Sequence, residues 1–274
     1  MPLRAATSAD LLPAAKCLAS ALKDNELFGE YMHPHRKEYP NDMQLFFLRL
    51  LREMYYCSAD DHILLATAGT TARIVGVAIW TRKRGSKWMG DRTRLDPFDR
   101  IVTRAKNAVS SFFYPDRAAD PTRLDVLERM EPFTAHLWKG TRAESWYLDL
   151  LGVEPDEQGQ GYGREMVQWG FERAKEEGIG CSVTAADGKE RFYERCGFDV
   201  KVGMASESGG DANPLKDVPG GMIMFWDGER AVEEVEDKKG VDERKGAGIA
   251  PGDYLEMLKA LGFPESQQAP SSAK

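Results

Sequence analysis

The sequence predicts an α/β protein, because strand-like and helix-like segments alternate along most of the chain. Residues 62–67 and 73–81 are rich in apolar and β-branched residues and flank a turn at residues 69–71, which predicts a hairpin. An apolar strand at residues 146–153 precedes a glycine-rich loop, and residues 164–177 then have helical spacing. These elements predict a sheet flanked by helices.

The N-terminal part predicts a short strand and two helices. Residues 3–6 are strand-like, and Thr7 or Ser8 can cap the first helix. Asn41 and Gln44 have the spacing of a capping box at the start of the second. Apolar residues recur at helical spacing in both helices, at Leu11, Leu12, Ala15, Leu18, Ala19 and Leu22 and at Phe47, Leu50, Leu51, Met54 and Tyr55.

The middle of the chain predicts a helical insert. Residues 82–140 are polar and interrupted by proline, with helical spacing at residues 101–113 and 122–137. We expect this insert to pack on or near the side of the functional site. Two further strands are expected near residues 199–204 and 221–226.

The C-terminal segment has the composition of a linker and tail. Residues 228–252 are rich in Glu, Lys, Asp and Gly and have little hydrophobic periodicity. Residues 253–261 can form a short helix, and the end of the chain is expected to be disordered. We therefore expect one domain at residues 1–227 and a charged, partly disordered tail at residues 228–274.

Composition argues against several classes of function. The net charge of −7 argues against a nucleic-acid surface. No apolar run is long enough to cross a bilayer, and the N-terminus lacks the apolar core of a signal peptide, so we expect no membrane partner. The expected location is the cytoplasm, and the expected assembly is a monomer or a homodimer. Widely spaced cysteines and the lone pair His33-Pro34-His35, expected in a solvated loop, predict no metal site.

The run Gln158-Gly159-Gln160-Gly161-Tyr162-Gly163 connects a predicted strand to a predicted helix. Glycines permit positive φ and close approach of a ligand, and the first N–H groups of a helix form an anion site. The run lacks the Gly-Lys-Ser/Thr ending of a P-loop and does not match the G-x-G-x-x-G dinucleotide fingerprint. It predicts a diphosphate cradle of a different kind.

Two motifs resemble one family. The Q-x-x-G-x-G form of Gln158, Gly161 and Gly163 resembles the acetyl-CoA loop of the GCN5-related N-acetyltransferases, the GNAT superfamily. The octet Arg191-Phe192-Tyr193-Glu194-Arg195-Cys196-Gly197-Phe198 is similar to the tyrosine-bearing segment of that family. The resemblance covers residues 146–198 closely and residues 3–226 more loosely.

This resemblance implies the GNAT fold and acetyl-CoA as cosubstrate. The implied fold is a central, mixed, mostly antiparallel twisted sheet, splayed at the acetyl-CoA strand and flanked by helices, with the helical insert added. Residues 5–10 and 77–80 also give the N-terminal half a looser resemblance to the puromycin N-acetyltransferase-type branch.

The resemblance further implies which residues contact acetyl-CoA. Backbone groups of Leu151, Gly152 and Val153 correspond to the segment that hydrogen-bonds the pantetheine arm, and Gly152 suits a β-bulge that splays the strands. The diphosphate is assigned to backbone and side-chain groups of the loop and the first helical turn, at Gln158, Gly159, Gln160, Gly161, Tyr162, Gly163 and Arg164.

Two residues are candidates for proton transfer. Tyr193 resembles the tyrosine that protonates the CoA sulfur, and the alternative is a packed aromatic residue. Strand alternation places Asp149 on one face with Tyr147 and Leu151, and Leu150 on the opposite face. Asp149 is either a general base, acting directly or through water, or the acceptor of a structural hydrogen bond from a neighbouring backbone group or arginine, because burying a carboxylate without a partner is costly.

These observations together predict an acetyl-CoA-dependent N-acetyltransferase that acetylates a primary amine by direct attack in a ternary complex. We expect a small-molecule amine, because the insert can wall a pocket. Two alternatives stay open. A protein or peptide N-acetyltransferase would need an open groove, and a catalytically silent GNAT-like module would bind acyl-CoA without transferring the acyl group.

Overall fold

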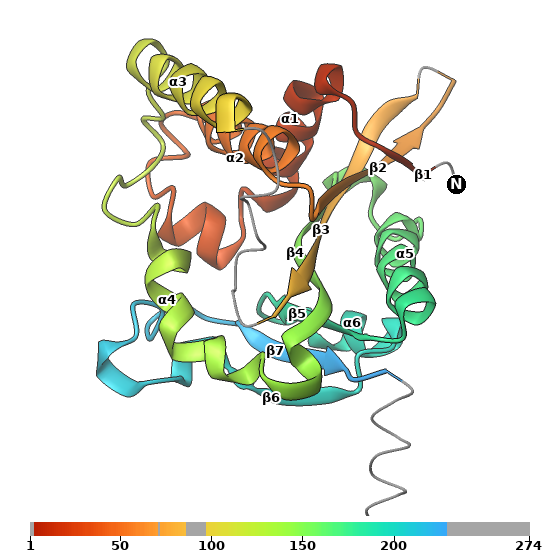
Figure 1. Ribbon diagram of the computed structural model, residues 1–274. Helices are drawn as coiled ribbons and strands as arrows, with labels where there is room; N and C mark the ends of the chain where they lie inside the picture. The colour runs from red at the N-terminus through yellow and green to blue at the C-terminus, as the bar shows by residue number, and fades with distance from the viewer. Residues whose placement is uncertain (1–2, 71, 86–96, 229–274) are drawn as a thin grey trace, which may run out of the picture. The chain divides into compact units, whose positions relative to one another are not determined.

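The computed structural model describes residues 3–70, 72–85 and 97–228, and within them seven strands form one sheet (Figure 1). The strand order is β1-β2-β3-β4-β5-β7-β6, and only β4 and β5 are parallel neighbours. The strands are β1 (Leu3–Ala5), β2 (Asp61–Ala68), β3 (Arg73–Arg84), β4 (Glu144–Val153), β5 (Gly180–Ala185), β6 (Val200–Met204) and β7 (Met222–Trp226). The predicted fold class and the β2–β3 hairpin are confirmed.

Helices cover both faces of the sheet, and Figure 1 shows α1 and α2 on one side of β2–β4 and α5 on the other. Side chains alternate along β3, so Val77 packs with Leu18 and Phe47, whereas Ala78 and Trp80 pack with α5. The helices are α1 (Leu11–Leu22), α2 (Met43–Cys57), α3 (Pro97–Phe113), α4 (Val126–Thr134), α5 (Tyr162–Glu177) and α6 (Glu190–Cys196).

Helix α5 lies very close to β3 at Trp80. The Trp80 ring is fully buried, and its indole N–H donates to the carbonyl oxygen of Met166 over 3.0 Å. A Cβ atom on Gly170 would lie 2.3 Å from the Trp80 ring, closer than any side chain permits. Gly170 therefore lets α5 rest on the indole, and the hydrogen bond fixes the position of the helix along β3.

Strand β4 contains one more residue than β3 over the same length. Ile79 is opposite Leu150, and the next residue, Trp80, is opposite Leu148, so Asp149 is the extra residue of a β-bulge. A bulge re-aims the side chains on either side of it, because one added residue reverses the alternation of faces.

The position of the bulge corrects two predictions. Leu150 packs with the α1 and α2 core and Leu151 packs toward α5, the reverse of the predicted faces. The bulge is also not at Gly152, where the pairing with β3 is regular. A Cβ atom on Gly152 would lie 3.0 Å from Leu18 and 3.1 Å from Ala21, so this glycine makes room for α1.

The predicted insert is helical, but its parts lie in different places. Strand β3 continues to Arg84, so the first residues of the predicted insert belong to the sheet. Helix α3 packs on α2, where the Asn107 amide donates to the Arg49 carbonyl oxygen over 3.2 Å. Helix α4 packs against the C-terminal half of the sheet, with Met130 in one cluster with Phe225. In the described part of the insert, only α4 therefore matches the expected position.

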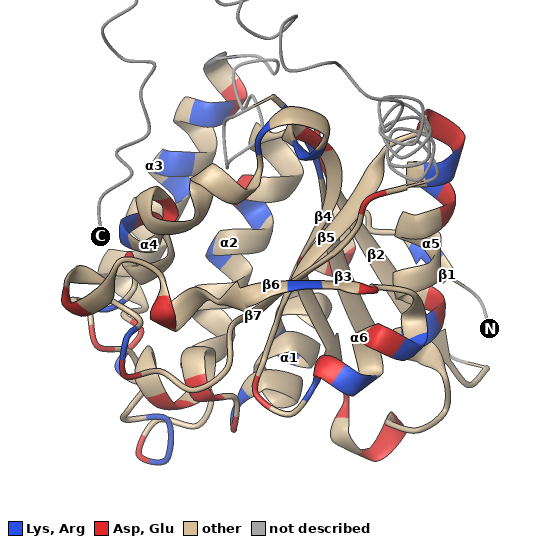
Figure 2. Cartoon of the chain, turned by 90° about the horizontal axis from the view of Figure 1, so that it is seen from below, with Lys and Arg blue, Asp and Glu red and all other residues tan. Residues whose placement is uncertain are grey.

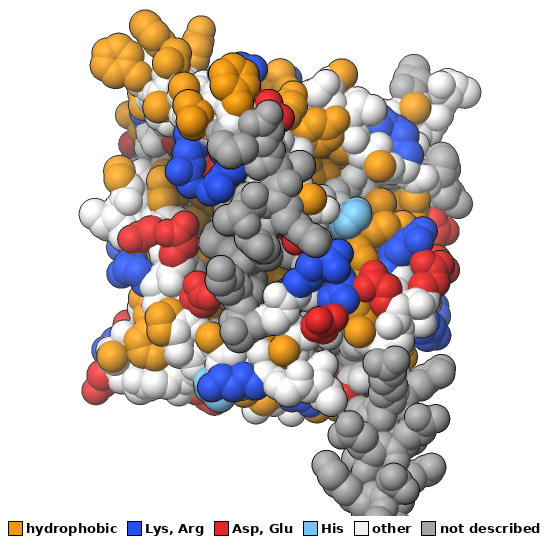
Figure 3. All heavy atoms as spheres, in the orientation of Figure 1, with side chains coloured by type: hydrophobic (Ala, Val, Ile, Leu, Met, Phe, Trp, Pro, Cys, Tyr) orange, Lys and Arg blue, Asp and Glu red, His pale blue; other side chains and the backbone are white. Residues whose placement is uncertain are grey.

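The surface of α3 is unusually apolar. Phe98, Ile101, Val109, Phe112 and Phe113 are 57–80% exposed. Figure 3 shows hydrophobic side chains gathered over this helix, at the top of the view. Figure 2 shows a different composition along α5 and α6, where positions of Lys or Arg alternate with positions of Asp or Glu.

Two local predictions are wrong. His33 is fully buried, and its Nε2 atom lies 3.1 Å from the Asp116 carboxylate, so this histidine anchors a buried segment. The N-cap of α2 is Asp42 rather than Asn41. The Asp42 carboxylate accepts a 2.7 Å hydrogen bond from Arg117, which ties the start of α2 to the segment after α3.

The predicted tail, residues 228–274, lies outside the described residues except for Gly228, and the division at residue 227 stays a prediction. Residues 86–96 of the predicted insert also lie outside them. Among the described helices, none combines the length and the apolar character that crossing a membrane requires.

The contact between Gly170 and Trp80 gives a first prediction. Gly170→Ala should lower the free energy of unfolding by about 1–3 kcal/mol in thermal or urea unfolding, because the core must shift around a fixed indole. The control is Gly163→Ala on the same helix, whose Cβ atom would lie 3.4 Å from Phe192, an ordinary contact. Equal stability of the two variants would contradict the tight contact at Trp80.

Candidate active site

Strands β4 and β5 separate beside the bulge. Their parallel pairing runs from Ser145 and Gly180 to Leu148 and Val183, whereas β4 continues to Val153. Within the described residues, β5 therefore pairs with no part of β4 beyond Leu148. The separation opens the peptide groups of residues 150–153 toward β5, which is the predicted splay.

Asp149 lies at the start of this splay. Its side chain is half-buried, and its Oδ2 atom is hydrogen-bonded to the hydroxyl of Thr81 on the neighbouring strand β3. The same hydroxyl lies 2.7 Å from Oδ1 of Asp61 on β2. Asp149 thus has a structural hydrogen bond, but its partner is a threonine hydroxyl and not the predicted backbone group or arginine. The role of Asp149 as a base stays a prediction, because a carboxylate accepts several hydrogen bonds.

A buried lysine lies close to Asp149. Lys83 is 1% exposed, and its Nζ atom lies 4.2 Å from the centre of the Trp138 ring and 4.5 Å from that of Tyr147. Burial lowers the pKa of Lys83 from 10.5 to about 7, and the negative charges of Asp149 and Glu131 offset this effect only in part. Lys83 therefore changes its charge near neutral pH.

A cavity of ≈ 140 Å³ lies over Asp149 on the side away from α5. Tyr147 and Thr184 lie in its wall, and the Tyr147 hydroxyl donates to the Thr184 hydroxyl over 3.2 Å. Glu26 adds a second carboxylate to the lining, from the short helical segment Glu26–Tyr31. The rest of the wall is mainly apolar and includes Leu27, Phe28, Leu127, Met130, Leu215 and Val218.

The glycine loop leads into the first turn of α5. Gly159 and Gly161 have φ values of +78° and +92°, which favour glycine. Gly161 is the N-cap residue, and its carbonyl oxygen accepts from the N–H of Glu165 over 3.1 Å. Helix geometry leaves the N–H groups before Glu165 without intrahelical acceptors, so they can bind an anion.

The side chains of the loop differ in what they can contact. The Gln158 amide donates to the Val153 carbonyl oxygen over 3.1 Å, so this side chain braces the loop. Tyr162 is 9% exposed and packs in the core beneath α5, which leaves only its backbone for a ligand. Gln160 and Arg164 are exposed.

Tyr193 is buried on α6, against Phe192 and Phe198. Burial raises the pKa of its phenol, so the hydroxyl keeps its proton at neutral pH. No hydrogen-bond partner for this hydroxyl is found among the described residues. Tyr193 is not among the residues that line the cavity over Asp149, so its role as a proton donor stays a prediction.

Residues 132–200 match the family model of the acetyltransferase (GNAT) domain. The matched segment runs from α4 to β6 and includes β4 with its bulge, the glycine loop, α5 and α6. The chain has a GNAT acetyltransferase domain.

The chain is similar to two solved acetyltransferase structures, of which the first supports the GNAT fold. The "histone acetyltransferase HPA2 and related acetyltransferase" from Corynebacterium glutamicum is 19% identical, with a TM-score of 0.50 over 82% of this chain and 95% of that one. PaiA N-acetyltransferase from Thermoplasma acidophilum, in complex with coenzyme A, is 12% identical, with a TM-score of 0.43 over 82% and 98%. The puromycin-type resemblance is not tested by these matches and stays a prediction.

Sequence reasoning missed several residues that the GNAT domain brings to the site. Thr81 and Lys83 lie at alternate positions at the end of an otherwise apolar strand, and two polar residues on one face were the available signal. Thr184 and Glu26 gave no such signal, because only the fold brings them to β4. In the described part of the chain, no cluster of three His, Cys, Asp or Glu residues could hold a metal ion.

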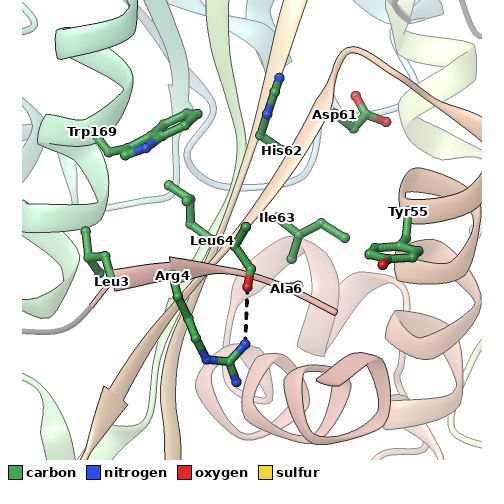
Figure 4. Close-up of a pocket in the computed structure, with 10 residues that line it drawn as sticks. Leu3, Arg4, Ala6, Tyr55, Asp61, His62, Ile63, Leu64 and Trp169 are labelled. Atoms are coloured by element: carbon green, nitrogen blue, oxygen red, sulfur yellow. Dashed lines mark hydrogen bonds between the residues drawn. The ribbon is translucent and has the colours of Figure 1, made fainter. Parts of the chain in front are cut away.

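A second hollow of ≈ 360 Å³ lies at the β1–β2 edge of the GNAT domain (Figure 4). Figure 4 shows Asp61 and Tyr55 on one side of β2 and His62 with Trp169 on the other, while Arg4 reaches toward a helix. The hollow is larger than the cavity over Asp149, but β3 separates its lining strands from β4. It contains none of the predicted site residues.

The lowered pKa of Lys83 gives a second prediction. Between pH about 7 and 10.5 the unfolded chain holds the Lys83 proton and the folded chain does not, so stability rises with pH in this window. The free energy of unfolding of the parent, minus that of Lys83→Met, should therefore increase as the pH is raised through it. A constant difference in urea unfolding would show that Lys83 has an ordinary pKa.

Proposed function

We propose that the GNAT domain transfers an acetyl group from acetyl-CoA to a primary amine of a small molecule, by direct attack in a ternary complex. The observation that carries this proposal is that two half-sites meet at Asp149. The α5 N-terminus and the open stretch of β4 lie on one side, and the cavity lies on the other. Holding two reactants side by side can supply a large part of the rate acceleration.

Acetyl-CoA would bind along β4 and the glycine loop. Its diphosphate would accept hydrogen bonds from the N–H groups of Gly163 and its neighbours at the start of α5. Its pantetheine arm would lie against the exposed peptide groups of Leu151, Gly152 and Val153, where β5 has separated from β4. The family match over this segment supports the assignment.

Asp149 and Tyr193 would handle the protons. An alkyl amine has a pKa near ~10.4 in water and must lose a proton before it attacks. Asp149 is in the cavity wall, where an incoming ammonium group would arrive. Tyr193 keeps its proton and would donate it to the departing thiolate.

The cavity favours an amine with a compact apolar body. Its ≈ 140 Å³ is close to the roughly 150 Å³ cavity that holds benzene in an engineered protein. Its lining includes two carboxylates, of Asp149 and Glu26, and no Lys or Arg among the described residues. An acceptor with a cationic amine on an apolar body is complementary to this wall. An acceptor that also carries a carboxylate is not, because the lining carboxylates would repel it.

The two alternatives make different demands. A protein or peptide acceptor needs an extended groove, whereas this cavity is bounded by α4, the Glu26–Tyr31 segment and residues 205–221. A silent acyl-CoA-binding module needs no base or acid at the splay. The carboxylate of Asp149 in the cavity wall and the protonated hydroxyl of Tyr193 therefore favour an enzyme.

Acetyl-CoA binding gives a third prediction. Millimolar acetyl-CoA should raise the melting temperature, since a ligand at about 100 times Kd adds about 2.7 kcal/mol. Gln160→Glu places a negative charge in the loop without changing the side-chain size. It should weaken acetyl-CoA binding about tenfold, because each charge pair at ~4 Å costs about 1 kcal/mol or more.

The matched control is Gln168→Glu, on the exposed face of α5 two turns further along. It should bind acetyl-CoA like the parent, and both variants should melt like the parent without ligand. Equal weakening in the two variants, or none in either, would place the diphosphate elsewhere.

Proton transfer gives a fourth prediction, measured by CoA release with phenylethylamine as acceptor. Tyr193→Phe should lower kcat by about 10²-fold with little change in acetyl-CoA affinity. Asp149→Asn should lower kcat/KM most at acidic pH and recover partly at high pH, where the amine loses its proton unaided. The hydroxyl of Tyr193 has no described partner, so Tyr193→Phe should not lower the melting temperature.

Parent-like turnover in Tyr193→Phe would remove the tyrosine from the reaction. A parent-like pH profile in Asp149→Asn, together with a lower melting temperature, would assign the aspartate a structural role. Faster CoA release with a lysine-containing peptide than with phenylethylamine would indicate that the acceptor is a protein or peptide.

A further inference from the structure

Three polar side chains connect the cavity over Asp149 with the hollow at the β1–β2 edge. Thr81 of β3 lies between Asp149 of β4 and Asp61 of β2, and its hydroxyl oxygen is in hydrogen-bond range of both carboxylates. The register explains the row, because Asp61 is opposite Thr81 and Thr81 is opposite Tyr147, two residues before Asp149. The three side chains therefore cross three adjacent strands.

A threonine hydroxyl has a single proton and can donate it to only one carboxylate at a time. The second contact is a hydrogen bond only if the other carboxyl group carries a proton and donates it to the hydroxyl oxygen. The row thus has two arrangements, with the extra proton on Asp61 or on Asp149. Moving both protons along the row converts one arrangement into the other.

The two ends of the row have different surroundings. Asp149 lines the cavity proposed for the acceptor, where Glu26 is a second carboxylate, and Lys83 is a charged group that interacts with Asp149. Asp61 lines the hollow of ≈ 360 Å³ at the β1–β2 edge, where Figure 4 shows its carboxylate, and His62 and Asp60 are nearby. Thr81 is 4% exposed, so the middle of the row is closed to bulk water.

Acetyl transfer to an ammonium group releases one proton overall. The nitrogen forms a bond to the acetyl carbon, the carbon–sulfur bond breaks, and of the two protons that the nitrogen loses one ends on the sulfur. The other must leave the site. When both substrates are bound, they separate the base from bulk water. The base must nevertheless lose its proton before the next turnover, so the proton needs another route out of the site.

We propose that Asp149, Thr81 and Asp61 form a proton relay that carries this proton from the acceptor amine to the hollow at the β1–β2 edge. The inference rests on the proposed acetyl transfer. Asp61 first releases its own proton to the hollow, and Asp149 takes a proton from the amine. Asp149 then passes this proton to the Thr81 oxygen while the hydroxyl proton of Thr81 passes to Asp61. Thr81 and Asp61 are thus positioning residues that act through Asp149.

The test compares substitutions at Thr81, with phenylethylamine and acetyl-CoA as substrates. Thr81→Val keeps the shape of the side chain and removes the hydroxyl, and it should lower kcat about tenfold at neutral pH with an unchanged KM for acetyl-CoA. Thr81→Ser should recover most of the loss. Thr103→Val, at a threonine that is also 4% exposed but lies on α3, should leave kcat unchanged.

A second variant guards against misfolding of Thr81→Val. Asp61→Asn leaves Thr81 in place but blocks the exit, so imidazole, a small base that can enter the hollow, should raise its kcat but not that of the parent. A parent-like kcat and pH profile in both Thr81→Val and Asp61→Asn would overturn the relay while acetyl transfer stands. Failure of the parent to release CoA with any amine would overturn the proposed function and the relay with it.

Discussion

The single extra residue in β4 is the feature on which the site depends. Asp149 has no opposite residue in β3, so the side chains of β4 after it point to the opposite faces of the sheet from those that regular alternation would give. The pairing of β4 with β5 ends at Leu148, the residue before Asp149. The bulge thereby places the Asp149 carboxylate at the point along β4 where the peptide groups of residues 150–153 become free of β5. A regular strand would have kept Leu150 and Leu151 on the predicted faces and left no opening between β4 and β5.

The core around β3 holds this irregular strand in place. Trp80 is opposite Leu148, directly before the bulge, and its indole supports α5 through the contact at Gly170 and the bond to Met166. The position of α5 in turn decides where its N-terminal N–H groups lie. On the other face, α1 approaches β4 closely because Gly152 has no side chain. The two close approaches hold the bulged segment between α1 and α5.

Charge is distributed unevenly around Asp149. On the α5 side the available groups are backbone N–H groups, which suit an anion, and on the cavity side they are carboxylates, which suit a cation. Lys83 lies between aromatic rings beside Asp149, and its pKa near 7 means that the local charge changes in the physiological range. The two half-sites thus suit ligands of opposite charge on the two sides of β4.

The sequence alone predicted the sheet, its hairpin, the loop into α5 and the family, since these follow from local spacing and from contiguous motifs such as residues 158–163 and 191–198. It also identified Asp149 as a carboxylate that needs a partner. Only the tertiary structure decided where β4 bulges and which residues surround Asp149. Register depends on packing against other strands and helices, so Thr81 and Lys83 come close to Asp149, and Asp61 close to Thr81, through pairing across strands that are distant in the sequence.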